Sequence, residues 1–222
     1  MANIIKLTAS DGSTVEFYDE IKAQGGVKDV YFSTDKTYVV AFYRNPTNAN
    51  DKARLENIVG VYREKIFVQN SDGDYWNDIF AWPTKMVEWK GLTGIVIPFY
   101  NKKFFFTGID AQWPFIKNGQ EKNGKWFSSA KLINKFVPAD QKGTFLSRLH
   151  MCLKIARGIR RIHAAGLAHS DLSYNNVLVD PLSGSACIID DDGLVVPGKF
   201  PPEVVGTPGF IAPEVLSKKK FA

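Results

Sequence analysis

Short apolar runs separated by glycine and polar turn residues dominate the first hundred positions of the chain. Residues 14–18, 27–33 and 37–44 are rich in β-branched and aromatic side chains and are bounded by Gly, Asp, Ser and Asn, which predicts antiparallel strands joined by tight turns. Residues 80–83 and 94–100 are two further strand-like runs, and the second is apolar enough for a strand buried on both faces. The pattern predicts a β-rich N-terminal region.

The apolar spacing changes to a helical period in two places. Within residues 51–64 apolar side chains recur every three or four positions, which predicts an amphipathic helix capped by Asn50 or Asp51. Residues 144–165 show the same spacing over a longer stretch, and Gly166 is placed to end that helix. The residues that repeat in this longer segment are Leu146, Leu149, Leu153, Ala156, Ile159 and Ile162.

Composition limits the function classes only broadly. The 222 residues are 45% hydrophobic and 23% charged, and the net charge of +5 does not by itself indicate nucleic-acid binding. No apolar run approaches the roughly 20 residues that span a bilayer, and the N-terminus lacks a secretion-signal pattern, so we expect a cytoplasmic protein without a membrane partner. Cys152 and Cys187 lie in apolar segments and are expected to be buried, reduced thiols.

Candidate chemistry begins with Asp171 and Asn176, which lie five positions apart just before an apolar run. A carboxylate can accept the proton of an attacking hydroxyl, and an amide oxygen can hold Mg²⁺ beside the phosphates of a nucleotide. Phosphoryl transfer needs little more than such positioning and charge neutralisation. The pair predicts Asp171 as a catalytic base and Asn176 as a metal ligand.

Three consecutive carboxylates end the next apolar strand. Residues 186–189 lead directly into Asp190, Asp191 and Asp192. Adjacent buried carboxylates repel one another unless a cation is present, and Mg²⁺ prefers hard anionic oxygens. The sequence therefore predicts a metal site, and both the apolar phase and the spacing of 14 positions from Asn176 favour Asp190 as its ligand.

These motifs resemble those of eukaryotic-type Ser/Thr protein kinases. Residues 169–176 resemble the catalytic loop H-R-D-L-x-x-x-N, and residues 206–214 resemble the G-T-P-x-Y-x-A-P-E end of an activation segment. The resemblance covers about residues 15–216. Ala81-Trp82-Pro83, a divergent glycine loop and an Ile-Asp-x-Asp stretch are similar to a divergent bacterial branch of the helix-hairpin-helix or tellurite-resistance-associated type.

The resemblance implies an α+β, bilobal fold. Its N-lobe would be residues 1–100, and its mainly helical C-lobe would be residues 101–222, ending just after the activation segment and so incomplete. It also implies transfer of the γ-phosphate of ATP, with Mg²⁺, to Ser or Thr hydroxyls of protein substrates or of the protein itself. Thr207 would hydrogen-bond the catalytic loop, and reading residues 191–193 as a D-F-G variant would make Asp191 the metal ligand instead of Asp190.

The phosphate-binding lysine of kinases is missing from its usual strand. Residues 38–44 contain no Lys, and Ala41 or Tyr43 takes the position, depending on register. Either the group has been lost, or Lys28 replaces it from the third-glycine position of the glycine-rich loop, as in the "with no lysine" kinases. The physics permits this replacement, because Lys is a point charge on a long flexible stem.

Residues 23–31 resemble a degraded glycine-rich loop. Gly25 and Gly26 would let the backbone approach phosphate oxygens, although an ordinary hairpin turn is an alternative. The helix of a kinase N-lobe carries a Glu that pairs with the lysine, and Glu56 is the candidate here, with Glu64 as the alternative.

The resemblance also places Val39, Ile97 and Phe99 at the nucleotide. Residues 97–100 would form the hinge whose backbone binds adenine, where Pro98 offers no N–H.

Several departures leave the activity open. Ser170 replaces the Arg that reads activation-loop phosphorylation, and Ser173 replaces the Lys that assists the γ-phosphate. We therefore weigh an active kinase against a pseudokinase that binds nucleotide and acts as a scaffold. His163 and His169 are expected to bond backbone groups. Residues 101–143 are interpreted as an insertion that contacts a partner protein.

Overall fold

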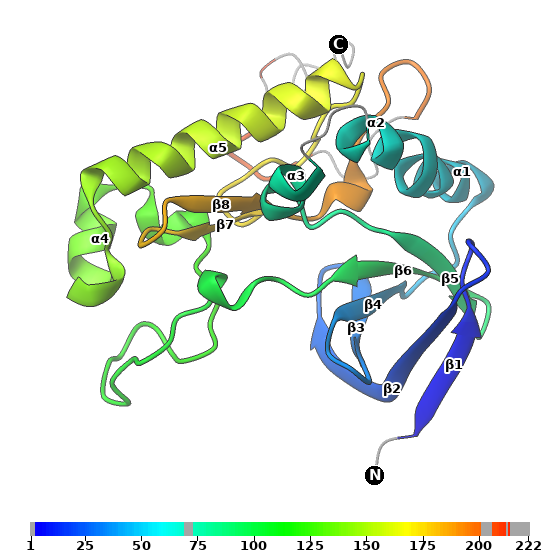
Figure 1. The fold of residues 1–222 in the computed structure, drawn as a ribbon, viewed down its shortest axis with the longest axis horizontal. Coiled ribbons are helices and arrows are strands. Elements are labelled where there is room, and N and C mark those ends of the chain that lie inside the picture. The colour runs from blue at the N-terminus through cyan, green and yellow to red at the C-terminus, as the bar shows by residue number, and fades with distance from the viewer. Residues whose placement is uncertain (1–2, 69–72, 201–205, 212, 214–222) are drawn as a thin grey trace. The chain divides into compact units, whose positions relative to one another are not determined.

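The computed structural model describes residues 3–68, 73–200, 206–211 and 213 (Figure 1). Within these ranges the chain divides into two compact units, Met1–Gln69 with Ala81–Phe99, and Asn70–Phe80 with Tyr100–Ala222. Residues 73–80 thus belong to the second unit, whereas the sequence analysis placed them in the N-terminal lobe. Among the described residues no helix combines the length and the apolar character needed to cross a membrane.

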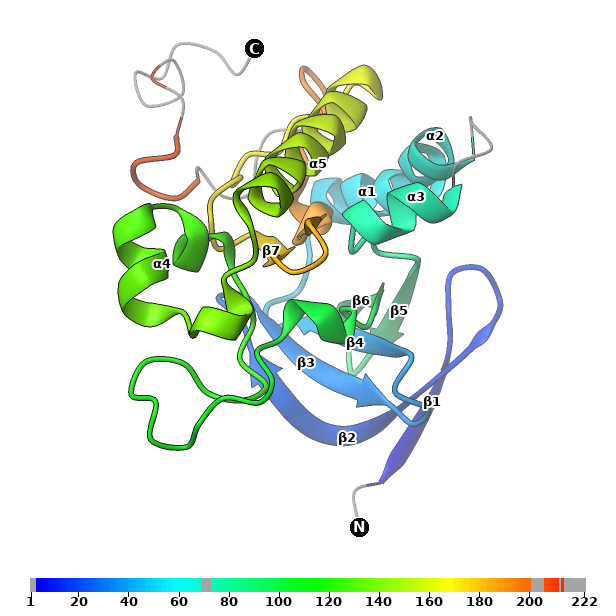
Figure 2. The ribbon, with the colours of Figure 1, turned by 60° about the vertical axis from the view of Figure 1, so that its left-hand side comes forward.

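The first unit is built on an antiparallel sheet in the strand order β1-β2-β3-β4-β6-β5. The strand β2 is bent, because its register against β3 shifts between Phe17 and Ile21 and again between Ile21 and Ala23 (Figure 2). The six strands are β1 (Ile4–Thr8), β2 (Thr14–Gln24), β3 (Lys28–Ser33), β4 (Tyr38–Tyr43), β5 (Lys85–Trp89) and β6 (Leu92–Pro98).

The sequence located the strands β2, β3, β4 and β6, but the strand predicted at residues 80–83 is wrong. Phe80 makes only an isolated bridge to Ile188, and the strand begins at Lys85. Pro83 has no N–H to donate to a sheet, which explains why the ladder starts beyond it. The strand β1 was not predicted.

The helix predicted over residues 51–64 forms as three consecutive segments. These are α1 (Ala49–Asn57), a π-helical turn (Ile58–Tyr62) and α2 (Arg63–Phe67). The N-cap is Asn48 rather than Asn50 or Asp51, and its side chain accepts a hydrogen bond from the Asp51 N–H at 2.9 Å. Trp82 Nε1 donates to the Ile58 carbonyl at 2.9 Å, so a side chain enters the backbone ladder where the π turn begins.

Aromatic rings form the core on one face of this sheet. Phe17, Tyr31, Phe42 and Trp89 contact one another with ring centroids 5.3 to 5.7 Å apart. Such edge-on and tilted contacts stabilise the sheet beyond the burial of their apolar area. This cluster holds β2, β3, β4 and β5 in register.

The second unit is organised on the helix α5 (Phe145–Ala164), which packs on the hairpin of β7 (Val177–Asp180) and β8 (Ser185–Ile188) (Figure 1). The helix α3 (Gly73–Ile79) packs against α5 and β8, and α4 (Ala130–Phe136) precedes α5. Thr144 caps α5 through a capping box with Ser147, and Gly166 follows its end with φ +81°. The prediction of this long helix is confirmed.

The N-terminal half of α5 exposes some of the apolar side chains that recur at helical spacing in the sequence. Leu146, Leu149 and Leu153 are 60%, 53% and 55% exposed. The strands of four residues in β7 and β8 are much shorter than this helix of 20 residues, so they cover only part of it. For the same reason Cys152 is exposed, which corrects the expectation that both cysteines are buried; Cys187 is buried on β8.

Residues 101–143 contain α4 and three short 3₁₀ turns, Lys102–Phe104, Gly124–Phe127 and Ala139–Gln141. Their aromatic and aliphatic side chains pack mainly on one another. The members of this cluster are Phe106, Ile109, Ile116 and Val137, with Trp113, Trp126 and Phe127 against them.

Lys122 ties this segment to β7 through a buried ion pair. Its Nζ lies 3.3 Å from Asp180 Oδ1 and donates to the Lys103 carbonyl at 3.0 Å. Lys122 and Asp180 are only 3% and 5% exposed. Burial raises the pKa of Asp180, but the hydrogen bonds from Ser183 and the charge of Lys122 outweigh it, and the net pKa is lowered.

Replacing this buried cation is expected to destabilise the second unit. In Lys122→Met the Asp180 carboxylate keeps its bonds from Ser183 but loses its counter-charge, so we expect the free energy of unfolding to fall by about 2 kcal/mol at neutral pH. Urea denaturation measures this loss. A variant as stable as the parent would show that the pair contributes nothing.

The same pair gives a pH dependence with a defined sign. Because the folded pKa of Asp180 is lowered, its ionised form stabilises the fold above the pKa of the unfolded chain, and this contribution disappears as the pH falls through the folded pKa. The stability difference between the parent and Lys122→Met is therefore largest near neutral pH and shrinks in acid.

Candidate active site

The loop that follows α5 is fixed by backbone hydrogen bonds within the second unit. Ala168 N donates to the Val195 carbonyl at 3.0 Å, and Val195 N donates back at 2.8 Å. At the other end of the loop, Ile189 N donates to the Asn176 carbonyl at 3.1 Å. The loop of residues 169–176 is thus held against the segment that follows β8.

Both carboxylate oxygens of Asp171 accept hydrogen bonds. Thr207 Oγ1 donates to Oδ1 at 2.6 Å, and Asn176 Nδ2 donates to Oδ2 at 3.1 Å and to the Asp171 carbonyl at 2.7 Å. The hydrogen bond expected from Thr207 to the catalytic loop is present. These contacts bring three of the candidate residues together and fix the direction in which the carboxylate points.

Asn176 is suited to hold a hard cation. Because its Nδ2 is engaged with Asp171, its other side-chain atom, Oδ1, is the oxygen that remains to accept or ligate. The side chain is half-buried between the loop and β7. Amide oxygens of this kind are among the ligands that Mg²⁺ accepts.

The three acidic residues after β8 differ in environment. Asp190 is exposed and adopts a left-handed conformation, φ 60°, which aspartate tolerates better than most residues. Asp191 and Asp192 are 1% and 3% exposed in the 3₁₀ turn Asp191–Gly193. The two candidate ligands, Asp190 and Asp191, are therefore an exposed and a buried carboxylate.

No three His, Cys, Asp or Glu side chains in the described ranges gather closely enough to hold a metal ion by themselves. Mg²⁺ is commonly bound by one or two protein oxygens together with waters and substrate phosphates. The donor set of Asn176 with Asp190 or Asp191 fits that kind of site.

Negative charge collects around Asp190. Burial, and then the charges of Asp190 and Glu121, hold the pKa of Tyr100 well above its usual value. Burial and the Asp190 charge raise the pKa of Glu121, against a hydrogen bond from Asn123. A cation near Asp190 would offset this charge. Sequence reasoning did not single out Glu121, because nothing in its local pattern distinguishes it from a surface residue.

His169 supports the loop as expected, but His163 does not. His169 Nε2 lies 3.3 Å from the Ile189 carbonyl; burial lowers its pKa, although that hydrogen bond and the nearby carboxylates act in the opposite direction. The His163 side chain is exposed and makes no hydrogen bond with a described residue, which corrects its expected role.

The two loop serines support the backbone locally and bring no positive charge. Ser170 Oγ donates to the Gly193 carbonyl at 3.4 Å, and Ser173, 3% exposed, accepts from the Asn175 N–H at 3.3 Å. Gly206 has φ +107°, and a Cβ there would lie 2.7 Å from the Ser170 carbonyl oxygen. Only glycine fits at this place, next to Thr207. Glu214, also part of the motif, lies outside the described residues.

In the first unit, Gly25 and Gly26 form the turn between β2 and β3, closed by a hydrogen bond from Gly25 N to the Lys28 carbonyl at 2.9 Å. Neither glycine has a positive φ, and an added Cβ would meet no close neighbour. The backbone of this hairpin turn thus does not itself require glycine. Arg44, which sequence reasoning missed, donates to the carbonyls of both glycines and orders the turn.

Lys28 lies directly across the sheet from Tyr43. The two are partners in the β3–β4 register, and the Lys28 ammonium is 5.7 Å from the centre of the Tyr43 ring. Ala41, the other candidate for the lysine position, pairs with Val30 instead. The structure therefore brings the Lys28 ammonium beside position 43 of the strand that lacks its lysine.

The structure does not bring Glu56 to Lys28. Glu56 and the alternative Glu64 are both exposed, and neither forms an ion pair with a described residue. The charged side chain buried by α1 is a cation, Arg54, which is 1% exposed and lies 3.8 Å from Asp51. Arg54 stands four residues before Ile58, which is buried, so the helical spacing could have indicated that Arg54 lies on the buried face.

Val39 and Ile97, two of the candidate nucleotide contacts, are brought together as partners on β4 and β6. Phe99 follows β6, where its ring packs on Phe32 with centroids 4.7 Å apart. Its N–H donates to the Thr37 carbonyl at 3.1 Å, so binding adenine through that group would require the bond to Thr37 to be replaced.

Comparison with known proteins identifies protein-kinase relatives for a part of the chain. No family model matches. The rat dual specificity testis-specific protein kinase 1 (Rattus norvegicus) is 42% identical over 78 residues, covering 31% of this chain and 12% of that protein. The dual serine/threonine and tyrosine protein kinase of Strongylocentrotus purpuratus is 40% identical over 73 residues, covering 32% of this chain and 8% of that protein.

Two solved structures share the fold over nearly the whole chain. A rhoptry kinase from Toxoplasma gondii aligns with a TM-score of 0.58 at 13% identity, covering 99% of this chain and 58% of that one. ROP2 from Toxoplasma gondii, a virulence factor with a protein-kinase fold and no enzymatic activity, aligns with a TM-score of 0.55 at 14% identity, covering 98% and 61%. These similarities confirm the predicted fold class.

Proposed function

We propose that this chain, which has an α+β protein-kinase fold with part of a C-lobe, transfers the γ-phosphate of ATP to Ser or Thr hydroxyls of protein substrates or of the protein itself. The observation that carries the proposal is the Asp171 carboxylate, fixed on one oxygen by Thr207 and on the other by Asn176. A fixed carboxylate in a loop of this kind is suited to orient a hydroxyl and accept its proton.

In this proposal each residue of the loop has a separate task. Asp171 takes the proton while the hydroxyl oxygen bonds to the γ-phosphorus, and the bond from that phosphorus to the oxygen bridging it to the β-phosphate breaks, releasing ADP. Thr207 and Asn176 keep the carboxylate pointing in one direction. Mg²⁺, held by Asn176 with Asp190 or Asp191, would neutralise phosphate charge.

In the first unit we assign the phosphate-binding charge to Lys28, as in the "with no lysine" kinases. Its place opposite Tyr43 on the lysine-free strand supports this assignment. Gly25 and Gly26 would present backbone to the phosphates, and Val39, Ile97 and Phe99 would contact the nucleotide base. Glu56 stays a prediction that the observed contacts do not support.

Other predictions stay at the level of the sequence. These are the placement in a divergent bacterial branch, the cytoplasmic location and the partner protein contacted by residues 101–143. The relatives described above come from animals, and most of the aromatic side chains of 101–143 are engaged with one another.

The alternative function is a pseudokinase that binds nucleotide and acts as a scaffold. Two observations favour it: β4 carries no Lys, and Ser173 is buried where a kinase has a phosphate-assisting Lys. ROP2 shows that a protein with this fold can lack enzymatic activity.

Label transfer separates the two functions. The protein is incubated with ATP labelled on the γ-phosphate, Mg²⁺ and a mixed protein acceptor, and nucleotide binding is measured on the same preparation. Label on the acceptor or on the protein, abolished by EDTA, supports the kinase. Bound nucleotide without any label supports the pseudokinase.

A further inference from the structure

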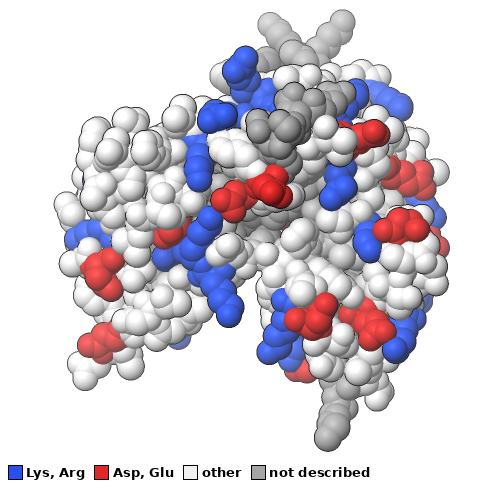
Figure 3. Space-filling model, viewed as in Figure 1, with Lys and Arg blue, Asp and Glu red and all other residues white. Residues whose placement is uncertain are grey.

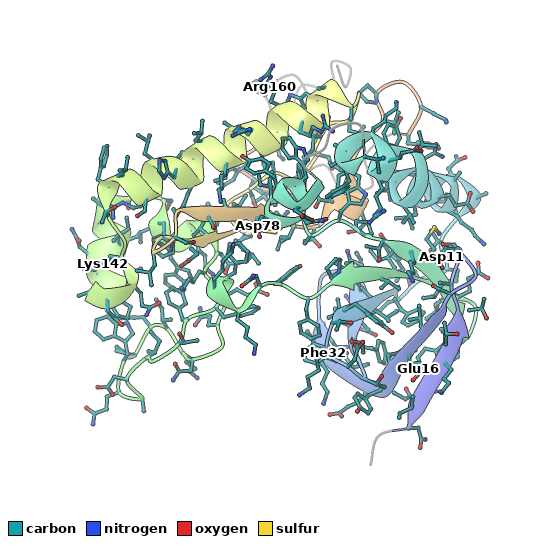
Figure 4. All side chains as sticks on the ribbon, in the orientation of Figure 1. Asp11, Glu16, Phe32, Asp78, Lys142 and Arg160 are labelled. Carbon is teal, nitrogen blue, oxygen red and sulfur yellow. The ribbon has the colours of Figure 1, made fainter. Side chains whose placement is uncertain are left out.

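A basic pocket lies between α3 and α5, inside the second unit, and none of its lining residues belongs to the loop of residues 169–176. It has a volume of about 280 Å³ and is lined by Trp76, Arg157, Arg160, Arg161 and Ala164. Figure 3 shows Lys and Arg side chains along the upper part of the view, where α5 runs, and Figure 4 shows Arg160 projecting from the outer side of α5. Among the described residues, none that lines the pocket is acidic.

Arg160 and Arg161 stand three and four positions after Arg157 on α5, so both are neighbours of Arg157 on the helix surface. Like charges at this spacing repel, so their grouping costs stability unless an anion is nearby. No described carboxylate forms an ion pair with Arg157 or Arg160. The face of α5 thus carries concentrated positive charge that the described part of the chain does not neutralise at these two residues.

Aromatic rings of α3 hold two of these guanidinium groups by their flat faces. Arg157 lies 4.6 Å from the centre of the Tyr75 ring, and Arg161 lies 5.1 Å from the centre of the Trp76 ring. An aromatic ring at this distance attracts a guanidinium group, and a guanidinium can still bind an anion through pairs of N–H donors. Trp76 is only 9% exposed, and its Nε1 donates to no described residue.

The number of donors points to a phosphate rather than a carboxylate. A carboxylate has two oxygens and is satisfied by one guanidinium fork, whereas a phosphate monoester has three terminal oxygens and a charge between about −1.5 and −2 at neutral pH. The exposed guanidinium groups of Arg157 and Arg160 together offer more donors than a carboxylate can use, and they match the larger anion. The pocket also offers the Trp76 ring and the Ala164 methyl group, which fit the carbon atoms of a peptide next to the phosphate.

We propose that this pocket binds a phosphorylated Ser or Thr carried on a protein segment. Arg157 and Arg160 would grip the phosphate oxygens, and Trp76 and Ala164 would contact the adjoining peptide. The pocket shares no residue with Asp171 and its partners, so this proposal does not rest on the proposed phosphoryl transfer.

The test is fluorescence anisotropy on the whole protein with a labelled peptide of Gly, Ala and one phosphoserine. The unphosphorylated peptide and inorganic phosphate, the latter as competitor, are the comparison probes. We expect Arg157→Gln/Arg160→Gln to weaken phosphopeptide binding at least about tenfold, because two charge-assisted forks are lost. Arg157→Lys/Arg160→Lys, which keeps the charge and loses the forks, should be weakened by an intermediate factor.

The matched control is Lys131→Gln, which removes one exposed positive charge from α4 and should bind as the parent does. Equal binding of the phosphorylated and unphosphorylated peptides would overturn the proposal, as would unchanged affinity in Arg157→Gln/Arg160→Gln. Inorganic phosphate that competes as tightly as the phosphopeptide binds would overturn the assignment to a protein segment. Thermal unfolding at the parental temperature shows that the variants are folded.

Discussion

Asp171→Asn is expected to lower the turnover number for phosphoryl transfer by about 10²–10⁴-fold while the affinity for ATP with Mg²⁺ stays close to that of the parent. The amide cannot take a proton from the hydroxyl, but it keeps the size of the carboxylate and can still accept the hydrogen bond from Thr207. ADP formation in the presence of a protein acceptor measures the turnover number, and calorimetry measures nucleotide affinity.

Asp19→Asn is the control for this substitution. Asp19 is exposed on β2, and its side chain makes no hydrogen bond with a described residue, so the same chemical change there should leave turnover unaltered. A catalytic base usually contributes at least about 10²-fold to the rate. If the turnover number of Asp171→Asn stays within a factor of about three of the parent value, Asp171 is not such a base. A parallel loss of nucleotide affinity would instead indicate a damaged loop, and Asp171→Ala tests this by removing the hydrogen-bonded side chain altogether.

Lys28→Met is expected to lower transfer by about 10²–10³-fold, since the phosphates would lose a preorganised positive charge. The cross-strand pairing permits a sharper experiment than a single substitution. Because Lys28 and Tyr43 are direct partners, Lys28→Met/Tyr43→Lys returns an ammonium group to the same place from the opposite strand. The double variant should transfer phosphate at least about tenfold faster than Lys28→Met, because a lysine acts as a flexible point charge.

Lys22→Met on β2 serves as the charge-matched control, because Lys22 is exposed and forms a surface ion pair with Glu20, which contributes little. Transfer by Lys28→Met at the parental rate would remove Lys28 from the site. If Lys28→Met is inactive and Tyr43→Lys restores nothing, Lys28 acts through the structure of the glycine turn and not through its charge at position 43. Calorimetry with ATP shows whether the loss lies in binding or in turnover.

The elements with strong periodicity could be predicted from sequence. The β-branched and aromatic content of β2, β3 and β4 and the helical spacing of α5 indicated the type and place of those elements. The sequence did not indicate how much of α5 is covered, because that depends on the length of the β7–β8 hairpin. It also misjudged residues 80–83, where apolar side chains are buried without belonging to the sheet.

The candidate site shows the same division. Motif spacing was sufficient to name Asp171, Asn176 and Thr207, but their hydrogen bonds join residues up to 36 positions apart and require the fold. Glu56 on α1 stays a prediction, and the charged residue that α1 buries is Arg54. The sequence did not indicate that Tyr100 and Glu121 lie near Asp190, because tertiary packing brings them there.

We propose above that Asp171 acts as the base in the transfer of the γ-phosphate of ATP to Ser or Thr hydroxyls. Its most direct test is mass-spectrometric mapping of phosphorylated residues after the parent and Asp171→Asn have each been incubated with ATP, Mg²⁺ and the same protein acceptor. The account predicts phosphoserine or phosphothreonine in the parent sample and none above background in the Asp171→Asn sample. Identical phosphorylated sites in both samples, or phosphate on tyrosine alone, would contradict it.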